Sequence, residues 1–125
     1  MRRIPVIVFL MLVASCTVAP SGGSGFVLDD GSIVGPETIS NGITTLEISN
    51  VGEFNHTLVV TDNEGNVFAA TDVVAPGTDA TLSVDLQPGA YQVSCRLVGQ
   101  DGDGNIIDHY ENGMFSQLEV ERSVE

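Results

Sequence analysis

Four side chains of the sequence carry soft donor atoms that bind transition metals. Downstream of residue 16 the chain contains two histidines, one cysteine and one methionine, in the order His56, Cys95, His109 and Met114. Imidazole and thiolate suit a metal that cycles between a soft and a harder oxidation state. Two histidines and a cysteine with a weak axial methionine form the electron-transfer centres of copper proteins. The sequence therefore predicts one copper site made from these four residues.

Each of the four residues also has an interpretation without a metal. His56 would begin a strand, where an exposed turn residue is common, and Met114 could fill a gap in the core. Cys95 lies in an alternating segment, so it could be a buried inert thiol. His109 follows a long insertion, which alone decides where it lies. The sequence by itself leaves these alternatives open.

The first fifteen residues have the pattern of a secretory signal peptide. Arg2-Arg3 precedes an apolar run over residues 4–13, which is too short to span a bilayer as a helix. The run ends in Val13-Ala14-Ser15-Cys16, which resembles the lipobox of bacterial lipoproteins, in which the cysteine is lipidated and becomes the new N-terminus. We therefore expect a signal peptide over residues 1–15 and lipidation of Cys16. The domain would lie outside the cytoplasm, anchored to the cell membrane by its lipid.

The rest of the chain has the size of one domain. Residues 16–25 are rich in serine, glycine and proline, which predicts a flexible tether, and residues 26–125 remain for a single core. With Cys16 lipidated, Cys95 would be the only thiol in an oxidising compartment, where cysteines normally pair. Metal ligation, a disulfide to a second chain and burial as a small hydrophobe each explain an unpaired thiol. The oligomeric state does not follow from the sequence.

The domain is strongly acidic. From Cys16 onward the chain has two basic residues, Arg96 and Arg122, against seventeen acidic ones, which gives a formal charge of −15. Such a field repels nucleic acid phosphates and attracts basic surfaces. Nucleic acid binding is therefore excluded, and basic redox proteins are the expected kind of partner. Solubility, or an origin in a salty environment, explains the acidity equally well.

Strand patterns fill the domain, and no segment has helical periodicity. Apolar and polar residues alternate over 42–48 and 57–61. Clusters of turn residues divide the remainder into short pieces at 66–70, 79–86, 90–97 and 115–121. Short strands at such spacing predict an all-β protein, an antiparallel sandwich or barrel that would hold the four donors rigidly.

Three motifs surround the candidate ligands. They are Asn50-Val51-Gly52 with His56-Thr57-Leu58-Val59-Val60, Leu86-Gln87-Pro88-Gly89-Ala90-Tyr91-Gln92-Val93-Ser94-Cys95, and His109-Tyr110-Glu111-Asn112-Gly113-Met114. Together they resemble the cupredoxin family, which includes plastocyanin, pseudoazurin and halocyanin, over residues 42–121. The resemblance implies a Greek-key antiparallel β-sandwich in which these histidines, the cysteine and the methionine bind one type 1 copper ion. It also implies a one-electron carrier. Cys95 and His109 could act as a thiol nucleophile and its base only with a pocket and an orienting group, which the sequence does not identify, so we expect no enzyme.

Two features depart from the family's pattern. Thirteen residues separate Cys95 from His109, where the family has only a few, and the turn residues over 99–105 predict a small hairpin that leaves the site and returns. Thr57 stands where the family commonly has an asparagine that supports the cysteine loop by hydrogen bonds. Two alternative functions remain: a copper module that stores, delivers or senses the ion, and a metal-free interaction domain of the same fold.

Overall fold

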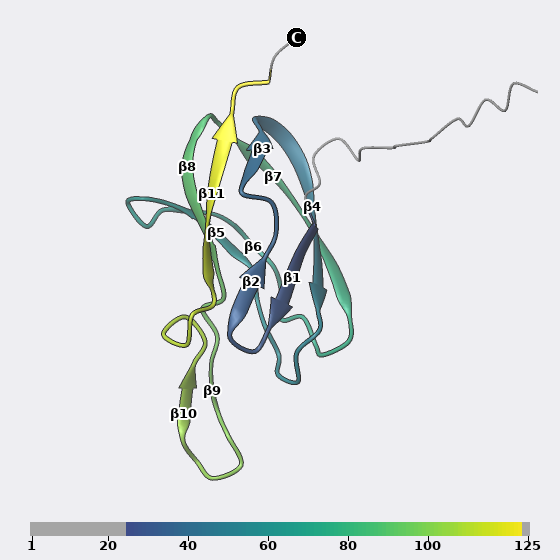
Figure 1. Cartoon of the computed structure of the whole chain (residues 1–125), viewed down its shortest axis with the longest axis vertical. Coiled ribbons are helices and arrows are strands. Elements are labelled where there is room, and N and C mark those ends of the chain that lie inside the picture. Colours follow the sequence, from purple (N-terminus) through teal and green to yellow (C-terminus); the bar gives the residue numbers. More distant parts are fainter. Residues whose placement is uncertain (1–24, 124–125) are drawn as a thin grey trace, which may run out of the picture.

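The computed structural model describes residues 25–123, which fold into a two-layered β-sandwich (Figure 1). The strands are β1 (Gly25–Asp29), β2 (Ser32–Val34), β3 (Thr38–Ser40), β4 (Gly42–Asn50), β5 (Val59–Asp62), β6 (Val67–Ala70), β7 (Asp79–Leu86), β8 (Gly89–Ser94), β9 (Val98–Gln100), β10 (Ile106–Asp108) and β11 (Phe115–Glu121). The predicted signal peptide, the lipidation site Cys16 and residues 16–24 of the predicted tether lie outside the described residues. Within residues 25–123 there is no helix with the length and apolar character needed to cross a membrane.

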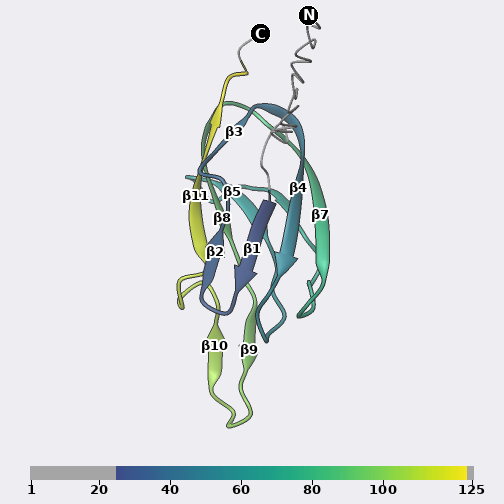
Figure 2. The ribbon, with the colours of Figure 1, turned by 45° about the vertical axis from the view of Figure 1, so that its right-hand side comes forward.

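Two sheets form the layers of the sandwich. One has the strand order β2-β1-β4-β7 and the other the order β3-β11-β8-β5-β6, while β9 and β10 form a separate hairpin. Figures 1 and 2 show the hairpin projecting from one end of the sandwich. The expected all-β sandwich is confirmed, and the predicted strands at 79–86 and 115–121 have the bounds observed for β7 and β11.

Alternation along the strands explains how the core forms. Successive side chains of a strand point to opposite faces, so a period of two places every second residue between the sheets. Examples are Phe26 and Leu28 in β1, and Leu118 and Val120 in β11, each at most 1% exposed. Burial of one such side chain contributes roughly 1.5–3 kcal/mol, so these rows hold the two sheets together.

The sequence pattern did not predict the three N-terminal strands. These strands are short, and Gly25, expected at the end of the tether, opens β1. β1 pairs in parallel with β4, and β3 pairs in parallel with β11, so both sheets are mixed and not purely antiparallel. A parallel pair needs a crossover connection. The chain over residues 30–41 provides one, because it adds β2 to the first sheet and β3 to the second before β4 begins.

The long segment between Cys95 and His109 forms the predicted hairpin. At its base Val98 of β9 lies opposite Asp108 of β10. Next to this pair, on the side away from the tip, the His109 amide donates a hydrogen bond to the Leu97 carbonyl at 3.2 Å. The two ends of the hairpin are therefore hydrogen-bonded neighbours, so His109 lies next to the point where the hairpin begins.

The turn at the tip of this hairpin has the same hydrogen bonds as a second turn elsewhere in the chain. At the tip the Asp101 carboxylate accepts hydrogen bonds of 2.9 Å from the amide and the side chain of Asn105. In the β5–β6 connection the Asp62 carboxylate accepts the same two bonds from Asn66, also at 2.9 Å. The glycine before each asparagine has φ of 82° or 84°, in the left-handed region that favours glycine. The same short pattern of aspartate, glycine and asparagine therefore reverses the chain in both places.

Candidate metal centre

The four predicted ligands lie where strands begin or end. His56 precedes β5, Cys95 follows β8, His109 follows β10 and Met114 precedes β11. Because β8 and β11 are antiparallel neighbours, the end of β8 meets the start of β11. Segments that are far apart in the sequence thus come together at the end of the sandwich from which the β9–β10 hairpin projects (Figure 1).

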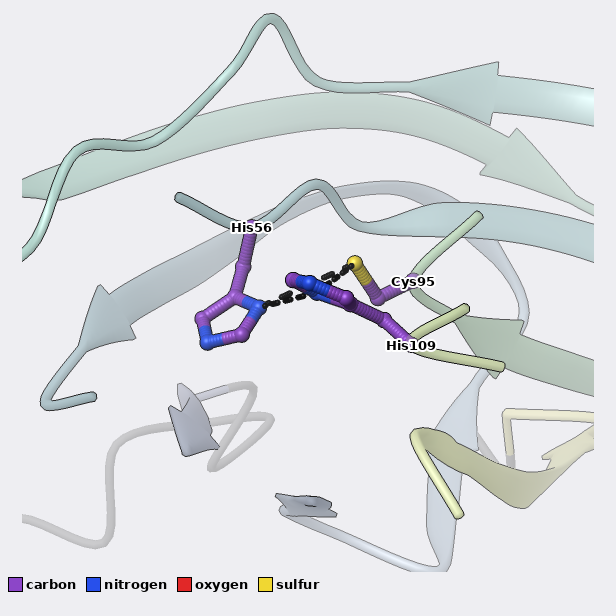
Figure 3. Close-up of side chains that lie close together, drawn as sticks. All are labelled: His56, Cys95 and His109. Atoms are coloured by element: carbon purple, nitrogen blue, oxygen red, sulfur yellow. Dashed lines mark hydrogen bonds between the residues drawn. The ribbon is translucent and has the colours of Figure 1, made fainter. Parts of the chain in front are cut away.

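Three of the candidate ligand atoms form a compact triangle (Figure 3). Nδ1 of His56 lies 2.9 Å from Nδ1 of His109. Sγ of Cys95 lies 3.8 Å from the first of these nitrogens and 3.5 Å from the second. All three residues therefore offer donor atoms within 4.8 Å of one another.

The triangle has the size that a trigonal metal ion requires. A point inside it and in its plane lies about 2.0 Å from all three atoms, which is the usual metal–nitrogen length and a little less than the metal–sulfur length of about 2.3 Å. Two imidazole nitrogens and one thiolate are donors that suit copper. The residues present therefore fit one type 1 copper ion.

The three side chains are shielded from water. His56 and Cys95 are 0% exposed, and His109 is 4% exposed. Burial lowers the pKa of His109, and repulsion by His56 lowers it further, against the opposing effects of Asp30 and Asp108. A lowered pKa keeps the imidazole neutral near neutral pH, as a nitrogen ligand must be.

Backbone hydrogen bonds hold these residues in place. The amide and the carbonyl of His56 pair with the carbonyl and the amide of Val74, at 3.1 and 2.7 Å. The Cys95 amide donates to the Met114 carbonyl at 3.0 Å, and the Met114 amide donates to the His109 carbonyl at 3.1 Å. Met114 is 0% exposed, so a buried residue joins the main chains of the cysteine and the second histidine.

The strand arrangement resembles solved structures, although no family model and no curated protein matches the sequence. Auracyanin from the photosynthetic bacterium Roseiflexus castenholzii superimposes with a TM-score of 0.60 at 19% identity, over 78% of this chain and 94% of that chain. An azurin from Methylomonas sp. strain J gives a TM-score of 0.59 at 16% identity, over 82% and 99%. Auracyanin A from Chloroflexus aurantiacus, described as a "blue" copper protein, gives 0.56 at 13% identity, over 78% and 99%. The chain has the cupredoxin fold.

Thr57 contacts the sulfur of Cys95 in this cupredoxin fold. Its amide donates a hydrogen bond to Sγ at 3.4 Å, and its hydroxyl lies 3.8 Å from the same atom. Thr57 occupies the position where cupredoxins commonly have an asparagine. It supports the cysteine mainly through the hydrogen bond from its backbone amide. Such hydrogen bonds adjust the electron density on a ligand sulfur. The Cys95 thiol is free and buried, so it is not exposed for a disulfide with a second chain.

Asp30 contacts the centre, and sequence reasoning did not identify it. Its Oδ1 lies 2.9 Å from Nε2 of His56, the ring nitrogen that faces away from the triangle. The same carboxylate accepts hydrogen bonds from the amides of Glu53 and Phe54, at 3.0 and 3.2 Å. Burial raises the pKa of Asp30, but the hydrogen bonds from Glu53, His56 and Phe54 outweigh it and hold the pKa below its usual value. No local motif links this aspartate to a histidine 26 residues later.

Proposed function

We propose that this chain carries single electrons through one type 1 copper ion. His56 and His109 would hold the ion through their Nδ1 atoms and Cys95 through Sγ, with the Met114 thioether as a further, weaker ligand. The observation that carries the proposal is the buried triangle of three soft donors, whose size fits a trigonal ion. When bound, copper supplies a one-electron change of oxidation state.

The contribution of the protein is to hold the donor atoms still. Cys95, His109 and Met114 each lie directly beside a strand end, and hydrogen bonds link their main chains. His56 is held by its bridge to Val74. A sandwich that holds its donors in one arrangement in both oxidation states keeps the reorganisation during transfer small. Burial of His56 and Cys95 keeps water away from the centre.

Electrons would enter and leave beside His109, the least buried of the four ligand residues at 4% exposure. The ring of Phe54 packs edge-on against the His109 ring, with centroids 6.3 Å apart, and Phe54 is 42% exposed. An exposed aromatic side chain therefore adjoins a ligand. The formal charge of −13 for the whole chain favours basic redox proteins as partners.

The closed centre favours electron transfer over storage, delivery or sensing of copper. Exchange of an ion requires an open path to its ligands, whereas His56, Cys95 and Met114 are each 0% exposed. An electron needs no such path. A cavity of about 400 Å³ lies along β1, β4 and β7, and none of the four ligands lines it.

Titration of the purified full chain with Cu(II) tests the copper site. One equivalent should produce an intense thiolate-to-copper band in the visible spectrum, and reduction should remove it. Cys95→Ser should abolish the band because a hydroxyl does not replace a thiolate, whereas the matched variant Cys16→Ser should keep it. Copper binding without the band would indicate copper handling, and no binding would indicate a metal-free interaction domain. Either result would overturn the proposal.

We also propose that the chain is a lipoprotein, anchored to the cell membrane outside the cytoplasm through Cys16. The support is the lipobox-like sequence that ends at Cys16, behind a basic and apolar leader. Expression of the full chain with radiolabelled palmitate tests this proposal. The label should enter the wild-type chain and be absent from Cys16→Ser. Equal labelling of the two chains would contradict lipidation at this residue.

A further inference from the structure

A carboxylate outside the ligand set contacts one of the proposed ligands. Oδ1 of Asp30 lies 2.9 Å from Nε2 of His56, with the Asp30 side chain 30% exposed and the His56 side chain 0% exposed. The other nitrogen of the same ring, Nδ1, faces His109 and Cys95 (Figure 3). The two nitrogens of one imidazole therefore have different partners on opposite sides.

This contact determines which nitrogen of His56 carries a proton. Both oxygens of Asp30 accept hydrogen bonds from the Glu53 amide, and Oδ1 also accepts one from the Phe54 amide. The carboxylate therefore acts as an acceptor, and Nε2 of His56 must be the donor. A neutral imidazole has a single N–H, so Nδ1 keeps its lone pair for a metal ion.

The surrounding chain leaves room for this contact and for little else. A Cβ atom on Gly52 would lie 2.2 Å from Oδ1 of Asp30 and 3.0 Å from Nε2 of His56. The buried Asn50 side chain shapes the same turn, because its Nδ2 donates to the Phe54 carbonyl at 2.8 Å and its Oδ1 accepts from the Gly52 amide at 2.9 Å. The turn thus presents its amides to Asp30 and leaves the space that the carboxylate occupies.

We propose that Asp30 is a positioning residue of the copper centre, an inference that rests on the copper site proposed above. Its carboxylate holds His56 in the Nε2–H tautomer and makes Nδ1 a stronger donor, which stabilises Cu(II) more than Cu(I). Partners that accept the second N–H of a metal-bound histidine act in this way in many metal sites, and their removal typically lowers metal affinity by roughly 10–100-fold.

Asp30→Asn tests the proposal, with Asp29→Asn as the matched control. Both changes remove one negative charge where β1 ends, but Asp29 is exposed and its carboxylate accepts a hydrogen bond from the Asp30 amide. Asp30→Asn should weaken binding of Cu(II) relative to Cu(I) about tenfold, which corresponds to a rise of about 59 mV in the reduction potential of a one-electron couple. Asp29→Asn should change the same ratio less than about threefold, because solvent and salt screen an exposed charge.

Two further measurements test the role of Asp30 even if Asp30→Asn folds poorly. Gly52→Ala keeps every charge but displaces the Asp30 carboxylate, so it should raise the potential in the same direction as Asp30→Asn. In the metal-free chain, nitrogen NMR should show His56 protonated at Nε2 in the wild type and in Asp29→Asn, and a mixture of tautomers in Asp30→Ala.

The outcomes separate this inference from the proposed function. Equal potentials for Asp30→Asn and Asp29→Asn, in chains that form the charge-transfer band, would overturn the role of Asp30 and leave the copper site standing. An unchanged His56 tautomer in Asp30→Ala would also overturn it. Absence of the band from the wild-type chain would instead overturn the proposed function.

Discussion

Shortening the β9–β10 hairpin should leave the metal centre intact. The hairpin closes at its base, where Val98 lies opposite Asp108 and the His109 amide donates to the Leu97 carbonyl at 3.2 Å. The position of His109 therefore depends on this base and not on the tip. The informative variant replaces residues 99–107 by Asn-Gly, a two-residue turn whose twist suits a hairpin.

The expected change in stability is small. Removing nine residues and adding two shortens the segment between Cys95 and His109 from thirteen residues to six, which favours folding by about 0.7 kcal/mol through a lower closure entropy. Ile106 is 73% exposed and contributes little. Ile107 is half-buried, and full burial of such a side chain is worth roughly 1.5–3 kcal/mol. The net change should therefore stay within about 1 kcal/mol, or about 4 °C in Tm for a domain of this size.

Urea unfolding and the visible spectrum of the Cu(II)-loaded chain measure both parts of this prediction. The control variant inserts two glycines between Asp108 and His109, which keeps the tip but moves His109 out of register with Leu97. We expect the shortened variant to keep the charge-transfer band and the insertion variant to lose it. The opposite pattern would refute the reasoning that the base of the hairpin positions His109.

The remaining predictions concern the axial ligand, metal binding and the turns. Met114→Leu conserves volume, so it should cost less than about 1.5 kcal/mol in stability, while the band persists and the reduction potential measured by voltammetry rises; an unchanged potential would argue against axial ligation. Copper at about 100 times its Kd should stabilise the native chain by about 2.7 kcal/mol in calorimetry and leave Cys95→Ala unaffected. The hydrogen bonds from the side chain and the amide of Asn105 lower the pKa of Asp101, so this turn should add stability above the usual pKa of 3.8 and lose it as the pH falls through the folded value. An NMR titration that found the Asp101 pKa at or above 3.8 would contradict this.

Sequence patterns predicted the strands whose two faces differ. β7 and β11 have one buried and one exposed face over seven or eight residues, which is long enough for a period of two to be recognised. β2 and β3 have three residues each, which is too few for such a pattern. In β1 the exposed residue between Phe26 and Leu28 is the apolar Val27, so the sequence does not alternate there. The pairing of β1 and β3 also depends on distant strands, since Phe26 lies opposite Ile48, and Ile39 opposite Val120. Local alternation contains no information about such partners.

The donor set and the hairpin were determined by the sequence alone. The types and order of His56, Cys95, His109 and Met114 indicated copper chemistry, and the turn residues after Gln100 predicted an excursion that returns. Both depend on the chemistry of single side chains or on backbone preferences over a few residues.

Only the tertiary structure decided that these donors meet and that Asp30 adjoins them. His56 and His109 are 53 positions apart, and Asp30 and His56 are 26 apart. Contacts between residues so far apart in the sequence form because the two sheets bury a common core, and the energy of that burial is spread over many side chains. The sequence therefore indicated which atoms could bind copper, whereas the packing of the whole sandwich set the 2.9 Å between the two Nδ1 atoms.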